Sequence, residues 1–113
     1  MTHDWWPRAR GLALWLLLSG AAAGVAACGS NPARHTVTME ATSFKPDVLT
    51  VNVGDTIVWI NKDMFPHTAT SQGRFDSGSI AVNSSWEYTP TEPAEIDYVC
   101  TLHPGMTGKL RVK

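Results

Sequence analysis

Val-Gly-Asp-Thr-Ile-Val-Trp-Ile-Asn, residues 53–61, is the clearest strand signal in this chain. Gly54-Asp55 is a typical turn pair, and residues 56–60 that follow are almost all apolar or β-branched. A nearly continuous run of this kind is typical of a strand that is buried on both faces. We therefore expect residues 56–60 to form a strand near the middle of a β-sandwich.

Shorter segments with strand-like patterns lie on both sides of this run. Together with residues 56–60, the predicted strands cover residues 35–39, 48–53, 67–70, 85–89, 94–100 and 108–112. Turn signals separate them at roughly the 8–12-residue spacing of β-sandwiches, and no segment has helical periodicity. The sequence therefore predicts an all-β fold, a Greek-key β-sandwich of seven to eight strands.

Alternation within the predicted strands assigns several side chains to the core or to solvent. In residues 94–100, Ile96 and Tyr98 share a face with Cys100. Pro46 is expected to interrupt the pattern, because it cannot donate to a ladder. The large side chains expected in the core are those of Trp59, Phe75, Ile80, Trp86 and Tyr88. The side chains expected in solvent are those of His35 and the charged turn residues Lys62, Asp63, Glu92 and Glu95.

The size and composition of the chain limit the classes of function that it can have. Its 113 residues are enough for one domain. The formal net charge of −1, with no basic run, gives no case for binding nucleic acid. Nothing in the sequence indicates self-association, so we expect a monomer.

Residues 1–27 have the features of an export signal. Arg8 and Arg10 form a positively charged start, an apolar run follows, and small residues end the segment. The last four residues up to Cys28, Val-Ala-Ala-Cys, resemble the bacterial lipobox. This resemblance implies cleavage before Cys28 and diacylglycerol on its thiol. The alternative is a transmembrane anchor, although the apolar run is shorter than the ~20 residues that a span needs.

These features define three expected segments and a location. Residues 1–27 are the lipoprotein signal peptide, residues 28–34 the lipidated N-terminus and tether, and residues 35–113 the folded domain. A lipid on Cys28 would hold the domain on a bacterial membrane without spanning it. The domain would then face the periplasm or the cell exterior.

A thiol, an imidazole and a thioether follow one another at three-residue steps in Cys100-Thr-Leu-His103-Pro-Gly-Met106. If lipid occupies Cys28, then Cys100 has no partner for an intramolecular disulfide, and a leftover cysteine in an exported protein indicates another role. Pro66-His67 offers a second imidazole upstream. A cysteine, two histidines and a weak axial methionine are the ligand set of a blue-copper electron-transfer site.

This ligand set suits a metal ion that changes its charge by one electron. A thiolate and two neutral imidazoles in one plane, with a long axial thioether, fit both Cu(I) and Cu(II). Cys100 would supply the thiolate, His67 and His103 the nitrogens, and Met106 the axial sulfur. Pro104 would supply turn chemistry in the loop that carries three of these ligands.

Other interpretations of these residues remain open. Taken singly, Cys100 could be a small buried apolar residue, His67 a loop histidine and Met106 a core filler. Taken together, they could bind zinc, although an axial methionine adds nothing to a zinc site. They could also belong to a module that carries copper rather than electrons. A copper enzyme with a second metal centre would need more histidines than the three that follow the predicted signal peptide, His35, His67 and His103.

Four segments of the chain resemble the cupredoxins, or blue copper proteins, and are most similar to the amicyanin, pseudoazurin and plastocyanin branch. The segments are residues 53–61, Pro66-His67, residues 75–78 and residues 98–106. The resemblance covers residues 36–113, and the two-residue gap between His103 and Met106 is similar to the short loop of amicyanin. Gly105 departs from the resemblance, because amicyanins tend to carry a larger residue there.

The resemblance implies an electron carrier with one type 1 copper per chain, held by His67, Cys100, His103 and Met106. It implies that hydrogen bonds of Asn61 tie the two ligand loops together. It also implies an exposed apolar patch around His103 that receives redox partners, both donor and acceptor, where ordinary loop packing is the alternative. The residues expected in this patch are Met64, Phe65, Pro66, Leu102 and Pro104.

The sequence thus predicts a membrane-tethered protein that transfers single electrons between redox partners outside the cytoplasm. No enzymatic activity is expected. The alternative left open is an extracytoplasmic copper-binding or trafficking module.

Overall fold

The computed structural model describes residue 20 and residues 31–113. Apart from Gly20, the predicted signal peptide lies outside these residues, and so does the predicted lipidation site Cys28. The described part of the chain contains no helix that is long and apolar enough to cross a membrane.

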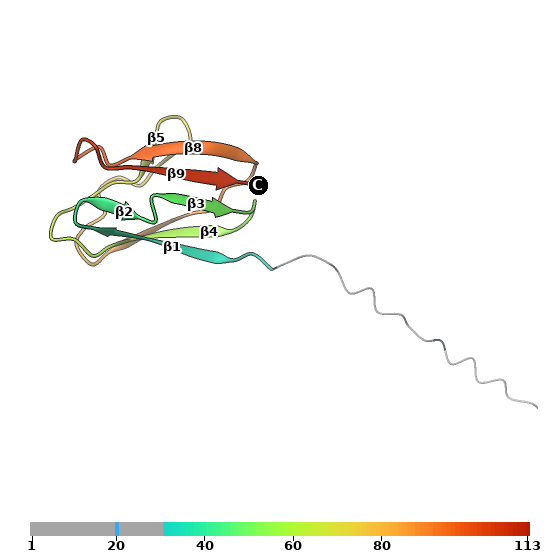
Figure 1. Cartoon of the computed structure of the whole chain (residues 1–113). Helices are drawn as coiled ribbons and strands as arrows, with labels where there is room; N and C mark the ends of the chain where they lie inside the picture. Colours follow the sequence, from blue (N-terminus) through green and yellow to red (C-terminus); the bar gives the residue numbers. More distant parts are fainter. Residues whose placement is uncertain (1–19, 21–30) are drawn as a thin grey trace, which may run out of the picture.

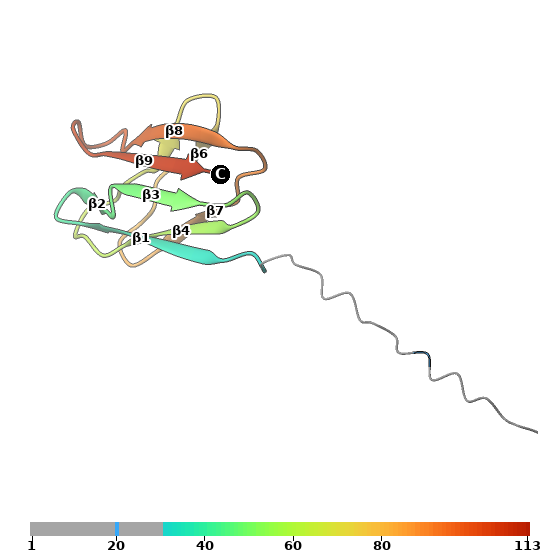
Figure 2. The same ribbon diagram turned by 45° about the vertical axis from the view of Figure 1, so that its right-hand side comes forward.

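In the described part of the chain, nine β-strands form two sheets that pack face to face (Figure 1; β6 and β7 are labelled in Figure 2). The four-stranded sheet contains, in spatial order, β2 (Ser43–Lys45), β1 (Arg34–Glu40), β4 (Thr56–Asn61) and β7 (Ser85–Tyr88). The five-stranded sheet contains β3 (Val48–Val51), β9 (Thr107–Val112), β8 (Ala94–Val99), β5 (Thr70–Ser71) and β6 (Phe75–Asp76). β1 pairs in parallel with β4, and β3 in parallel with β9, while the other pairs are antiparallel. The predicted all-β sandwich is confirmed, with nine strands among residues 31–113 rather than seven or eight.

The run that gave the clearest strand signal forms β4, an interior strand whose side chains reach the core. Trp59 is fully buried, and its ring lies 5.4 Å from that of Tyr98 and 5.5 Å from those of Phe75 and Trp86, measured between centroids. Trp86 and Tyr88 are only partly buried at the edge of this cluster. Aromatic pairs of this kind contribute about 0.5–1.5 kcal/mol each beyond their area burial, so the cluster helps to join the two sheets.

Strand β8 shows the alternation that the sequence predicts. Ile96, Tyr98 and Cys100 are buried, whereas Asp97 and Val99 are exposed. Because Cys100 is the last residue on the buried face, its side chain lies inside the sandwich just beyond the end of the strand.

Strand β2 was not predicted from the sequence. It pairs with the end of β1, and the ring of its Phe44 is buried 4.7 Å from that of Tyr98. Pro46 lies just beyond β2, so its missing N–H does not interrupt the ladder. The turn between β1 and β2 consists of Ala41 and Thr42, with φ of 50° and 52°. Asn-Gly or Asp-Gly is usual in such a turn, so the usual hairpin signal is missing.

The segment between β4 and β7 also differs from the prediction. Residues 67–70 do not form one strand, because His67 makes an isolated bridge to Ile80 and β5 begins at Thr70. Phe75 lies outside the predicted strands but begins the short strand β6. Phe75 and Ile80 are both buried, as the sequence predicts.

Strand β3 ends at Val51, two residues earlier than predicted, because the chain turns there. The Asp55 N–H donates to the Asn52 carbonyl oxygen at 3.0 Å, and the Val53 N–H donates to the Lys113 carbonyl oxygen at 3.0 Å. This turn leads directly into β4 and lies at the end of the sandwich where β1 begins (Figure 1).

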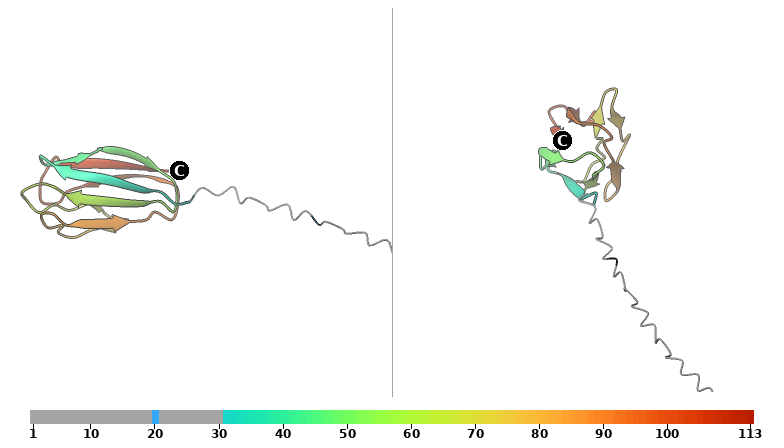
Figure 3. Two further views of the ribbon diagram at one scale, coloured as in Figure 1. Left: turned by 90° about the horizontal axis from the view of Figure 1, so that it is seen from below. Right: turned by 90° about the vertical axis from the view of Figure 1, so that its right-hand side faces the viewer.

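The point at which the chain enters the domain and the loops that carry the predicted ligands lie at opposite ends of the sandwich (Figure 3). β1 and β4 run in parallel, so the start of β1 lies beside the start of β4. The end of β4, the end of β8 and the start of β9 meet at the opposite end. The loops that carry the predicted ligands follow β4 and β8, and they therefore lie far from the point at which the chain enters the domain.

His35 is half-buried rather than solvated, because it pairs with Asp55. Its Nε2 lies 2.9 Å from Asp55 Oδ2, and the same carboxylate accepts the N–H groups of Asn52 at 3.0 Å and Ala33 at 2.9 Å. The hydrogen bonds from Asn52, His35 and Ala33 lower the pKa of Asp55 from 3.8 to about 2. Asp55 thus connects the start of the domain to the turn before β4.

This low pKa of Asp55 predicts how the stability of the domain depends on pH. The contribution of the carboxylate is fully present above about pH 4 and is lost as the pH falls toward about 2, because the folded state has the lower pKa. The free energy of unfolding should therefore fall more steeply over this range in the wild type than in Asp55→Asn, which has no titrating carboxyl group there. Urea unfolding followed by tryptophan fluorescence measures the free energy of unfolding of both proteins at each pH. Parallel curves of this free energy against pH would contradict the prediction.

Candidate metal centre

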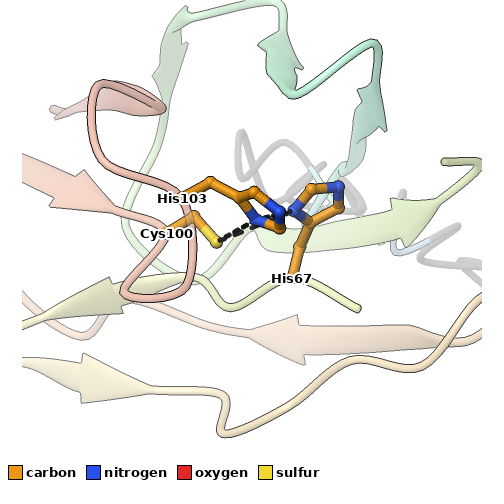
Figure 4. A group of neighbouring side chains, drawn as sticks. All are labelled: His67, Cys100 and His103. Atoms are coloured by element: carbon orange, nitrogen blue, oxygen red, sulfur yellow. Dashed lines mark hydrogen bonds between the residues drawn. The ribbon is translucent and has the colours of Figure 1, made fainter. Parts of the chain in front are cut away.

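Two loops at one end of the sandwich bring three of the four predicted ligand side chains together, those of His67, Cys100 and His103 (Figure 4). The first loop follows β4 and leads to His67. The second loop joins β8 to β9 and contains Cys100, His103 and Met106. Since β4 and β8 belong to different sheets, the packing of the two sheets determines how the loops approach each other.

Three donor atoms from these loops form a small triangle. His67 Nδ1 and His103 Nδ1 are 3.0 Å apart, and Cys100 Sγ lies 3.7 Å from the first and 3.6 Å from the second. His67 and Cys100 are buried, and His103 is partly exposed. A thiol and two imidazole nitrogens at these distances could hold one metal ion.

The triangle is close to the size that a metal ion at its centre requires. Imidazole and thiolate bind zinc at about 2.0 and about 2.3 Å, so ligands about 120° apart lie about 3.5 Å (N–N) and about 3.7 Å (N–S) from each other. The two S–N distances of 3.6 and 3.7 Å fit this geometry, and the N–N distance of 3.0 Å corresponds to a narrower angle at the metal. The residues suit copper, because they offer one thiolate, two imidazoles and a methionine that lies on the same loop as Cys100 and His103.

Met106, the predicted axial ligand, is buried on the same short loop. The Cys100 N–H donates to the Met106 carbonyl oxygen at 3.0 Å, and the Met106 N–H donates to the His103 carbonyl oxygen at 3.2 Å. Gly105 has a φ of 88°, a backbone conformation that residues with a Cβ rarely adopt. These bonds fold the loop back on itself, so that its three candidate ligands are held as one unit.

Asn61 is fully buried and organises the first ligand loop. Its Nδ2 donates to the carbonyl oxygens of Phe65 at 2.7 Å and Ile80 at 3.0 Å, and its Oδ1 accepts the Asp63 N–H at 2.9 Å. Among the described residues, none of its side-chain hydrogen bonds reaches the second loop. Asn61 therefore shapes the first loop, whereas the sequence had led us to expect a tie between the two loops.

Thr68 makes the direct connections between the two loops, and sequence reasoning missed it. Its N–H donates to Cys100 Sγ at 3.3 Å, and its Oγ1 accepts the Thr101 N–H at 2.9 Å. An N–H donor favours the thiolate over the thiol, and the thiolate is the form that binds a metal. The available signal was the position of Thr68 directly after His67.

Asp63 was expected in a solvated turn, and this expectation is wrong. Only 12% of its side chain is exposed, and its Oδ2 lies 2.9 Å from His67 Nε2. Hydrogen bonds from the Thr42 N–H, from His67 and from the Met64 N–H lower the pKa of Asp63 from 3.8 to about 2, so it is a carboxylate at neutral pH. The available signal was a carboxylate four residues before a candidate ligand, since such histidines commonly donate their second N–H to a carboxylate.

The apolar residues that flank the two histidines are exposed, as the sequence predicts. The exposed fractions are 83% for Met64, 53% for Phe65 and 50% for Leu102, and Pro66 and Pro104 are also exposed. The ring of Phe65 lies 6.1 Å from that of His103, measured between centroids. Exposed apolar side chains on two neighbouring loops are typical of a contact surface.

Comparisons with known proteins identify the family to which this chain belongs. Residues 33–113 match the copper binding proteins of the plastocyanin/azurin family. Amicyanin from Paracoccus denitrificans is 32% identical over 76 residues, which are 62% of this chain and 58% of that protein. Plastocyanin from Synechococcus sp. (strain JA-2-3B'a(2-13)) is 28% identical over 86 residues, 61% of this chain and 62% of that protein. The chain therefore spans about three fifths of the length of these curated relatives.

Solved structures with the same fold include copper proteins of different sizes. A Cu(I) form of an amicyanin variant is 30% identical, with a TM-score of 0.68 over 75% of this chain and 86% of that chain. A copper-containing nitrite reductase from Thermus scotoductus SA-01 is 32% identical with a TM-score of 0.68, but only 23% of the enzyme is covered. Residues 33–113, which match the family, include both ligand loops and all nine strands of the described residues. The chain therefore belongs to the plastocyanin/azurin family of copper-binding proteins, the cupredoxins, and its cofactor is one type 1 copper.

Proposed function

We propose that this protein is a blue-copper electron carrier in which His67, Cys100 and His103 are the equatorial ligands and Met106 is the axial ligand. The observation that carries the proposal is the triangle of donor atoms, with S–N separations of 3.6 and 3.7 Å. When bound, copper supplies a Cu(II)/Cu(I) couple that changes by one electron. Because the hydrogen bonds of the two loops already hold the ligands close together, little has to move when an electron arrives or leaves.

The residues around the ligands favour retention of the metal. His67 and Cys100 are buried, and the Thr68 N–H donates to Cys100 Sγ at 3.3 Å. A buried thiolate is poorly accessible to a competing ligand from solvent. This arrangement favours an electron carrier over a module that delivers copper to other proteins.

We propose that electrons enter and leave through His103. Its ring is the partly exposed member of the triangle, and it lies beside the exposed ring of Phe65. Met64, Phe65, Pro66, Leu102 and Pro104 would form the docking patch for one-electron donor and acceptor proteins. A small apolar surface suits partners that bind, exchange an electron and leave quickly.

We also propose that residues 1–27 export the chain and that lipid on Cys28 holds it on a bacterial membrane, facing the periplasm or the cell exterior. The support is the sequence of this segment together with the position of the first strand. β1 begins at Arg34, at the end of the sandwich opposite the ligand loops (Figure 1). A tether that ends there would direct the copper end of the domain away from the membrane and toward its partners.

Electron self-exchange between copies of the copper-loaded domain tests this function. NMR line broadening in mixtures of oxidised and reduced protein should show exchange in the wild type. Leu102→Asp should slow the exchange at least about 10-fold, because it places like charges opposite each other when two patches meet. Val53→Asp is the matched control, since Val53 is an exposed valine at the opposite end of the sandwich.

Two outcomes would contradict the proposal. Equal slowing by Leu102→Asp and Val53→Asp would exclude the patch as the route of the electron. Rapid loss of copper to a Cu(I)-selective chelator after each reduction would instead support the copper-trafficking alternative.

A further inference from the structure

The two histidines of the copper centre differ in the hydrogen-bond partner of Nε2, the ring nitrogen that does not lie beside Cys100. His103 is partly exposed, and no side chain or main-chain group of the described residues is hydrogen-bonded to its Nε2. His67 is fully buried, and its Nε2 lies 2.9 Å from Asp63 Oδ2. One imidazole is therefore fixed by a carboxylate, and the other faces the surface.

Asp63 is held firmly enough to fix its partner. Its Oδ2 also accepts the Thr42 N–H at 2.8 Å, and its Oδ1 accepts the Met64 N–H at 2.9 Å. Its own N–H donates to Asn61 Oδ1 at 2.9 Å. The carboxylate thus has bonds on both oxygens and a fixed main chain, which leaves it little freedom to rotate away from His67.

The bond to Thr42 extends this support to another part of the fold. Thr42 and Ala41 form the β1–β2 turn, and both have positive φ values that residues with a Cβ adopt at some cost. The N–H that Asp63 accepts belongs to this turn. One carboxylate therefore links the β1–β2 turn, the first ligand loop and the His67 ring.

Taking the proposed copper carrier as its basis, we propose that Asp63 is a positioning residue that fixes the ring and tautomer of His67 and sets the reduction potential of the copper. An ionised carboxylate can only accept hydrogen bonds, so His67 donates its Nε2–H to Asp63. The lone pair of the neutral ring is then on Nδ1, the atom that lies beside Cys100 Sγ and His103 Nδ1. A carboxylate partner of this kind orients a ligand imidazole and raises its basicity.

The charge of Asp63 has a second consequence. A negative charge just beyond a ligand ring stabilises the more positive metal, Cu(II), over Cu(I). The site is partly shielded from water on this side, because His67 is fully buried and Asp63 is only 12% exposed. Removal of the charge should therefore favour reduction.

Two substitutions separate the charge from the hydrogen bond. Asp63→Asn can keep an oxygen in the place of Oδ2, so that the bonds from His67 and Thr42 remain while the charge and the bond from the Met64 N–H to Oδ1 are lost. Asp63→Ala removes both. Asp55→Asn is the matched control, because the Asp55–His35 pair has the same oxygen–nitrogen distance of 2.9 Å at the far end of β4.

Spectroelectrochemical titration of the copper-loaded proteins measures the effect of the charge. Asp63→Asn should raise the equilibrium constant for reduction about 10-fold, which is equivalent to about 59 mV for one electron. Asp63→Ala should in addition weaken Cu(II) binding about 10- to 100-fold in chelator competition and alter the Cu(II) electron paramagnetic resonance spectrum. Asp55→Asn should leave the potential near the wild-type value, because the six residues of β4 separate Asp55 from the ligand loop and, at about 3.3 Å per residue, span more than a Debye length of about 10 Å.

The same titration distinguishes failure of this inference from failure of the proposed function. Suppose that the wild type forms a blue copper centre, but Asp63→Asn changes the equilibrium constant for reduction no more than Asp55→Asn does. The role of Asp63 is then only structural, and the inference is overturned. If the wild type forms no blue copper centre, the proposed function is overturned and this inference with it. The Asp63→Asn result stands whether or not Asp63→Ala folds.

Discussion

Cys100→Ser is expected to abolish the intense visible absorption of the Cu(II)-loaded protein. In a blue-copper site this absorption requires a thiolate bound to the metal, and Cys100 carries the sulfur that lies within 3.7 Å of both imidazole nitrogens. Copper affinity should also fall by at least the 10- to 100-fold seen when partners outside the ligand set are lost. A visible spectrum before and after ascorbate, together with chelator competition, measures both effects.

The fold should survive this substitution, which makes the result interpretable. Serine is slightly smaller than cysteine, and its oxygen can still accept the N–H that Thr68 donates to Cys100 Sγ. Circular dichroism of the metal-free proteins should therefore be unchanged. Cys28→Ser is the control, because it removes the other thiol of the chain and should leave the absorption intact. Persistence of the band in Cys100→Ser would rule out the assigned ligand.

Gly108→Ala is expected to destabilise the domain by about 1–3 kcal/mol, the usual cost of extra volume in a packed core. A Cβ on Gly108 would lie 2.5 Å from Tyr98 Oη and 2.7 Å from Cε1, with Cζ closer still. Tyr98 cannot easily retreat, because it is 1% exposed and packs edge-on against Phe44 and Trp59. Urea unfolding of the metal-free proteins measures the loss of free energy.

A double-mutant cycle tests whether the Tyr98 ring is the cause. Tyr98→Leu destabilises the domain by itself, but it vacates the space next to Gly108. In that background, Gly108→Ala should cost less than about 0.5 kcal/mol, since the two residues are in contact and their effects do not add. Equal costs in both backgrounds would show that something other than the ring opposes the methyl group.

The sequence was a good guide to the fold where burial depends on a regular pattern. The apolar run of β4 and the alternation of Ile96, Tyr98 and Cys100 in β8 follow directly from which faces of a strand are buried. The short strands β2, β5 and β6 could not be found in this way. Each has only two or three residues, too few to show a period, and each exists because a neighbouring strand offers it hydrogen bonds.

The candidate ligands could be found because their chemistry is rare and their spacing is short. The residues that support them could not be found so easily, because most of their partners lie far away in the sequence; the bond of Asp63 to His67, four residues later, is the exception. Asp63 contacts the Thr42 N–H of a turn that lacks the usual residues, and Thr68 meets Cys100 and Thr101 only after the two sheets have packed. Main-chain donors of this kind leave no mark on the sequence.

Strand β9 comes after every other described strand, yet it lies inside the five-stranded sheet between β3 and β8. β3, more than fifty residues earlier, pairs with it in parallel from Val48↔Lys109 to Val51↔Val112. A nascent chain therefore cannot close this sheet, or the loop that carries Cys100 and His103, while β9 is still inside the ribosome. For the export proposed above, this delay would be useful, since a translocation channel threads unfolded polypeptide and would receive a chain that has not yet folded. With the export proposed above, metal insertion would follow translocation, because the loop that carries Cys100 and His103 closes only when β9 joins the sheet.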